Sequence, residues 1–98
     1  MKTLEILPEA HQLVVKGNLT REFITANIER QSTRDLSNNI THINLSQVDA
    51  VDTAGLAWLL LMVENAQKAD LPLKLVDLPE DLVKLAKLSA VSAFLPVQ

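Results

Sequence analysis

The chain has 98 residues, of which 48% are hydrophobic and 21% charged, the composition of a globular protein with one modest core. It has no cysteine, which excludes disulfides, cysteine-ligated metals and thiol nucleophiles. Nine Lys and Arg residues against twelve Asp and Glu residues give a net charge of −3, without the basic stripe or aromatic platform that nucleic-acid binding requires. We expect a single domain over residues 1–98.

The N-terminal segment does not have the pattern of a signal peptide. Glu5 and Pro8 stand where the apolar core of such a peptide would lie. The longest uncharged apolar run covers residues 54–63, about half of the ~20 residues that cross a bilayer. These observations predict a cytoplasmic protein without a membrane-spanning helix.

The first residues of the chain predict two strands. Residues 3–7 and 12–16 are short runs of β-tolerant residues, separated by Pro8-Glu9-Ala10. Gly17-Asn18 is a typical turn pair, so we expect the second strand to end in a turn there.

Residues 21–36 predict an amphipathic surface helix, because apolar residues recur among charged ones. Either Thr20 or Thr25 supplies its N-cap. Residues 40–45 then alternate apolar and polar side chains, which is the period of a half-buried strand. We expect residues 46–52 to form a loop.

The C-terminal half predicts two helices on either side of a short strand. The first helix covers residues 54–69, the strand 73–76 and the second helix 80–88, followed by an apolar tail. The order of elements is therefore β-β-α-β-α-β-α. Because strands separated by helices need crossover connections, we expect an α/β fold with a mixed sheet of about four strands and three to four helices mainly on one face.

The sequence offers little for catalysis. His11 and His42 are the only imidazoles and do not have metal-ligand spacing. Gly17 and Gly55 stand alone, so no glycine loop cradles a phosphate, and no serine lies in a nucleophile elbow. We therefore expect no enzymatic activity, no cofactor and no metal site.

Two carboxylates precede the helix at residues 54–69. Asp52 or Thr53 is expected to cap this helix by accepting a hydrogen bond from a backbone N–H, a contribution of ~1 kcal/mol. Asp49 and Asp52 also favour the positive end of the helix dipole. With no acid–base partner nearby, these carboxylates are interpreted as structural.

The same helix is apolar on two faces. At roughly 100° per residue one stripe, which we assign to the core, comprises Leu56, Leu59, Leu60, Val63 and Ala66. The opposite face comprises Ala54, Trp58, Leu61 and Asn65, with Met62 on its flank. Either the tail covers this second face through Phe94, Leu95 and Val97, or the face is a partner-binding site centred on Trp58.

Residues 52–56, Asp-Thr-Ala-Gly-Leu, follow a predicted strand and precede Leu59-Leu60 and Ala66. This pattern resembles the Asp-Ser/Thr-small-Gly-Leu signature of STAS domains, the sulfate-transporter and anti-sigma-factor-antagonist modules. Gly17-x-Leu19 is similar to the turn after the family's second strand, and the leucines of residues 73–95 are similar to its last strand and helices. The resemblance covers essentially the whole chain and implies the STAS fold.

Within the family, the chain is most similar to the MlaB branch, the cytoplasmic subunits of bacterial Mla phospholipid ABC transporters. The similarity lies in the length, in Thr53-Ala54 before Gly55, and in the closing run of residues 85–96. It implies a non-catalytic subunit that binds the transporter's ATPase subunit beside the permease and supports maintenance of outer-membrane lipid asymmetry. It also implies that Thr53 and the following helix lie at the ATPase contact.

The anti-sigma-factor antagonists form a second branch with a different function. Their motif hydroxyl is phosphorylated by a partner kinase, and phosphorylation breaks the complex. The corresponding residue is Thr53, although this chain has Thr-Ala where two serines are common in that branch. A homodimer that buries the Trp58 face is the third and least favoured alternative.

The sequence thus predicts one partner-binding site at the start of a helix. It comprises Asp52, Thr53, Ala54, Gly55, Trp58, Leu61 and Met62, with Thr53 as the candidate phosphorylation site. The pattern leaves open which face of the helix packs on the sheet, and exchanging the faces would exchange core and interface.

Overall fold

The computed structural model describes residues 3–98 and confirms the expected order of elements. The elements are β1 (Leu4–Glu9), β2 (Gln12–Leu19), α1 (Ala26–Leu36), β3 (His42–Val51), α2 (Thr53–Lys68), β4 (Lys74–Val76), α3 (Glu80–Leu88) and the short 3-10 helix η1 (Ser92–Phe94).

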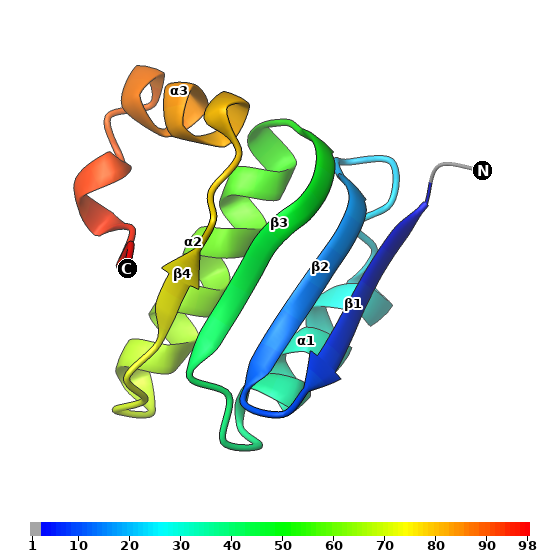
Figure 1. Cartoon of the computed structure of the whole chain (residues 1–98), viewed down its shortest axis with the longest axis vertical. Helices are drawn as coiled ribbons and strands as arrows, with labels where there is room; N and C mark the ends of the chain where they lie inside the picture. Colours follow the sequence, from blue (N-terminus) through cyan, green and yellow to red (C-terminus); the bar gives the residue numbers. More distant parts are fainter. Residues whose placement is uncertain (1–2) are drawn as a thin grey trace.

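The strands form one mixed sheet in the order β1-β2-β3-β4. β1 is antiparallel to β2, whereas β2, β3 and β4 are parallel to one another. Figure 1 shows α1 and α2 behind the sheet and α3 beyond the end of β4. The α/β class and the placement of the helices mainly on one face are therefore as the sequence predicts.

The core lies between the sheet and these helices. Alternate strand residues such as Leu13 and Val15 in β2, and Ile43 and Leu45 in β3, are fully buried on the helix-facing side. α2 contributes seven buried residues, more than α1 or α3. It is the central helix of the fold.

Gly17 lies inside β2 rather than in a turn at its end, so the expected end at residue 16 is wrong. Its φ is 98°, and a Cβ atom at this position would lie 2.0 Å from the carbonyl oxygen of Thr3. The Gly-Asn pair therefore serves a close approach between β1 and β2, not a chain reversal. The reversal lies earlier, because β1 extends to Glu9 and Glu9 pairs with Gln12.

β3 continues to Val51, so the expected loop at residues 46–52 is also wrong. Residues 16–19 of β2 pair with this second half of β3. Gly17 pairs with Val48 and Asn18 with Ala50, which leaves Asp49 as an extra residue without a β2 partner. An earlier irregularity lies between Asn44 and Gln47, which pair with Val14 and Lys16, and the alternation of side chains in the sequence ends there.

α1 begins at Ala26, five residues later than expected, and Thr25 is its N-cap. Thr25 Oγ1 accepts a hydrogen bond of 3.2 Å from the N–H of Ile28. Residues 20–25 instead form the β2–α1 connection, in which the N–H groups of Phe23 and Ile24 both donate to the carbonyl oxygen of Thr20.

Candidate partner-binding site

Asp52 is the N-cap of α2, which decides between the two capping candidates. Its Oδ1 accepts a hydrogen bond of 3.1 Å from the N–H of Gly55. Its Oδ2 accepts another of 2.9 Å from the N–H of Arg21, in the β2–α1 connection. One carboxylate therefore satisfies the first turn of α2 and holds a segment 31 residues away in sequence.

Gly55 is buried where α2 passes the end of β2. A Cβ atom on it would lie 2.1 Å from the carbonyl oxygen of Leu19 and 2.9 Å from Cγ2 of Val51. Gly55, predicted as a partner contact, is therefore required for packing inside the chain. Its contribution to a site is to let the start of α2 lie against β2 and β3.

Thr53 is exposed at the first position of α2, and Ala54 beside it is half-buried. The solvent-facing side of α2 continues from Thr53 along successive helical turns. We call this side the outer ridge, and it comprises Thr53, Ala57, Leu60, Leu61 and Glu64. Of its apolar members, Ala57 is exposed, and Leu60 and Leu61 are half-buried and pack partly against the core.

Three residues of the outer ridge, Ala57, Leu60 and Glu64, are missing from the predicted site. Ala57 was not assigned, although it lies four residues from Thr53 and four from Leu61, the spacing of neighbours on one helix face. Leu60 was placed in the core stripe, and the structure leaves it half-exposed. The other four members of that stripe, Leu56, Leu59, Val63 and Ala66, are buried as expected.

The expectation that Trp58 and Met62 lie on an exposed face is wrong. Their exposed fractions are 1% and 0%, so neither side chain is available to a partner in this conformation. α1 lies against this flank of α2, where Asn65, two turns beyond Trp58, donates a 3.3 Å hydrogen bond to Thr33 Oγ1. The indole Nε1 of Trp58 is buried without a hydrogen-bond partner.

The C-terminal tail covers α2 only in part. Leu95 is buried, and Leu75 of β4 forms a parallel bridge with Val97. Phe94 and Val97 remain 65% and 53% exposed. The tail therefore reaches the core through Leu95 and does not close over the molecule.

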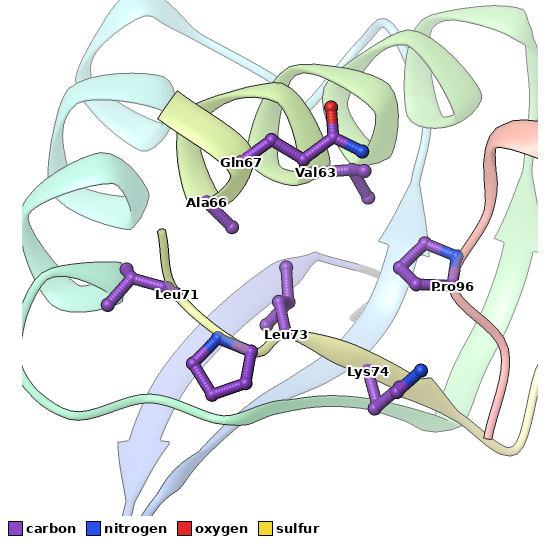
Figure 2. A pocket seen from close by; sticks show the side chains of 8 residues that line it. Val63, Ala66, Gln67, Leu71, Leu73, Lys74 and Pro96 are labelled. Carbon is purple, nitrogen blue, oxygen red and sulfur yellow. The ribbon is translucent and has the colours of Figure 1, made fainter. Parts of the chain in front are cut away.

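A hollow of about 270 Å³ lies between the C-terminal half of α2 and β4. Figure 2 shows Val63, Ala66 and Gln67 on one side, with Leu73 and Pro96 across from them. None of the residues of the predicted site lines it. The hollow is thus separate from Thr53, which lies fourteen residues, or ~21 Å, away from Gln67 along α2.

The other polar groups singled out in the sequence have local partners or stand apart. His42 Nδ1 lies 2.7 Å from Thr41 Oγ1, and His11 Nδ1 lies 3.2 Å from the carbonyl oxygen of Asn39. Within residues 3–98, no three His, Cys, Asp or Glu side chains are grouped as metal ligands would be. Over the same residues, every helix is too short or too polar to cross a bilayer.

The arrangement of a mixed sheet, one helical layer and an exposed hydroxyl at the start of the central helix is that of a STAS domain. The family model described as "Mlab, STAS domain" matches residues 3–96, so the chain belongs to this STAS family. No curated protein matches the chain in sequence.

A solved structure of the anti-sigma factor antagonist SpoIIAA in its unphosphorylated form is similar to this chain. The match covers 100% of this chain and 88% of SpoIIAA, with a TM-score of 0.56 and 12% sequence identity. At this identity the likeness concerns the fold, and it supports the order and placement of the elements described above.

Proposed function

We propose that this chain is a non-catalytic, protein-binding subunit of an Mla-type phospholipid ABC transporter, and that its partner is the ATPase subunit. The observation that carries the proposal is the outer ridge of α2, which begins at the exposed Thr53 and presents apolar side chains to solvent. The description of the matching family model as MlaB-type supports this choice of partner.

The geometry favours binding over chemistry. Thr53 is not needed as a cap, because Asp52 already supplies the acceptor, so its hydroxyl is free to meet a partner. Small side chains at Thr53, Ala54 and Ala57 let another protein approach the helix closely. Leu60 and Leu61 add apolar area of the kind that is found at the centre of protein interfaces.

The proposal is tested by measuring the affinity of the purified chain for the purified ATPase subunit. Thr53→Glu should weaken binding at least ~10-fold, because a carboxylate would be buried without a partner in the contact. Gln67→Glu is the matched control, since Gln67 is exposed on the same helix ~21 Å from Thr53. Failure of the parent chain to bind the ATPase subunit would overturn the proposal.

A second candidate function is that of a phosphorylated antagonist, favoured by the exposure of Thr53 and the SpoIIAA-like fold. A phosphate on Thr53 would add about −1.5 to −2 charges at the start of α2. It would be attracted by the helix dipole and repelled by the nearby Asp49 and Asp52 carboxylates. Intact-mass measurement after incubation with cell extract and ATP tests this function. The function requires that one phosphate be added to the parent chain and none to the Thr53→Ala variant.

A further inference from the structure

The outer ridge alone is too small for a stable contact. From Thr53 to Glu64 it extends ~17 Å along a helix ~10 Å wide, an area on the order of 170 Å². A typical interface buries about 800 Å² on each partner. An interface of 800 Å² is about a seventh of the 5811 Å² accessible surface of this chain. The partner must therefore also contact segments beside α2.

The β2–α1 connection is the segment that the structure attaches to the start of α2. Arg21 donates its N–H to Asp52 Oδ2 at 2.9 Å, while Asp52 Oδ1 holds Gly55. A third bond of 3.4 Å joins the N–H of Asp52 to the carbonyl oxygen of Leu19. Figure 1 shows this connection and the start of α2 at the same end of the molecule.

We propose that Asp52 is a positioning residue of the partner-binding site: its second carboxylate oxygen holds residues 21–23 beside Thr53, so that the two segments form one contact surface. This inference rests on the proposed function. Arg21 and Glu22 are exposed and Phe23 is half-exposed, so the connection that Asp52 joins to the start of α2 carries a cation, an anion and an aromatic ring.

The remaining anchors of the connection fix its two ends and its own turn, in which the N–H groups of Phe23 and Ile24 donate to the carbonyl oxygen of Thr20, but they do not join it to α2. Ile24 packs against the core, and Thr25 caps α1. Leu19, before the connection, is fully buried. Residues 21–23 lie between these fixed points, and the Arg21 N–H bond is their tie to α2.

Aspartate is the side chain that this double role requires. Asparagine and serine cap helices about as well as aspartate. Each of them, however, offers only one oxygen acceptor in place of the two carboxylate oxygens. An Asp52→Asn or Asp52→Ser chain can therefore keep the bond to Gly55 and lose the bond to Arg21.

The test compares Asp52→Asn and Asp52→Ser with the parent chain in binding to the purified ATPase subunit. Asp49→Asn is the control, because it removes one negative charge from an exposed residue of β3 without touching either bond. Amide hydrogen exchange is recorded for Arg21 and Gly55 in each chain. We expect both Asp52 variants to bind ~10-fold more weakly, with faster exchange at Arg21, unchanged exchange at Gly55 and only a small fall in the urea midpoint, because one hydrogen bond is lost.

Three outcomes would overturn the inference. Parental affinity of the Asp52 variants despite faster exchange at Arg21 would show that the connection is no part of the contact. If Asp49→Asn weakened binding of the ATPase subunit equally, the loss of affinity would come from the lost negative charge and not from the lost hydrogen bond. Unchanged amide exchange at Arg21 would show that the Asp52 carboxylate does not hold the connection. The Thr53→Glu variant tests the proposed function independently of Asp52. If Thr53→Glu weakens binding, the ATPase subunit contacts α2, even where the Asp52 variants bind as the parent does.

Discussion

Gly55 of α2 lies so close to Leu19 of β2 that a Cβ atom on Gly55 would stand 2.1 Å from the Leu19 carbonyl oxygen. The same carbonyl oxygen accepts the 3.4 Å hydrogen bond from the N–H of Asp52. Because backbone atoms form this contact, no side-chain rotation can relieve it. The height of α2 above the sheet, and with it the position of Thr53, is therefore set by the absence of a side chain at residue 55.

Gly55→Ala should destabilise the protein, although alanine is normally better than glycine in a helix by about 1 kcal/mol. The added methyl group forces α2 away from β2, and overpacking of this kind costs about 1–3 kcal/mol. After the helix-propensity gain is subtracted, we expect a net loss of about 1–2 kcal/mol in the free energy of unfolding, measured in urea. An alanine variant as stable as the parent would show that the start of α2 shifts freely.

Trp58→Ala should cost about 3–5 kcal/mol in the free energy of unfolding, because it empties a fully buried core position. Trp58→Phe is the matched control and should cost less, since it also removes the buried Nε1–H that has no partner. Unfolding is followed by circular dichroism, because Trp58 is the only tryptophan of the chain. A Trp58→Ala chain as stable as the parent would contradict the burial of Trp58 in the core.

Thr25→Ala should destabilise the protein by about 1 kcal/mol, because it removes the oxygen that caps Ile28 N–H at the start of α1. Thr20→Ala is the comparison, since only the backbone carbonyl of Thr20 holds the turn at Phe23 and Ile24. Its effect should stay within about 0.5 kcal/mol. Urea unfolding of both variants measures the difference, and equal losses would contradict the assignment of the cap.

The sheet and the helix order follow from strong local patterns in the sequence. The parallel strands have apolar residues at successive or alternate positions and are separated by helical segments, a pattern typical of an α/β fold. The second half of β3 is different, because its pairing with β2 contains the Asp49 bulge and no regular alternation. Gly17 likewise carries a turn signal, while the reason for glycine is the approach of Thr3, which only the folded backbone reveals.

The candidate site also combines features that the local sequence predicts with features that only the folded chain reveals. The sequence narrows the cap of α2 to Asp52 or Thr53, and the structure assigns it to Asp52 and leaves Thr53 exposed. Whether the Trp58 side chain is buried depends on which element packs against each flank of α2. A helical projection shows two apolar faces without showing that α1 joins one of them through Thr33 and Asn65. The bond between Asp52 and Arg21 links residues 31 apart and has no local signal at all.

Ala57→Arg should weaken binding of the ATPase subunit at least ~10-fold, because a long charged side chain would stand in the middle of the outer ridge, one turn from Thr53. Arginine is a good helix former and Ala57 is exposed, so the free energy of unfolding should change by less than about 0.5 kcal/mol. Gln67→Arg adds the same side chain near the far end of α2 and should bind as the parent does. If Ala57→Arg and Gln67→Arg bind alike, the outer ridge is not where the partner lies, and the contact must be sought on another face of the STAS fold.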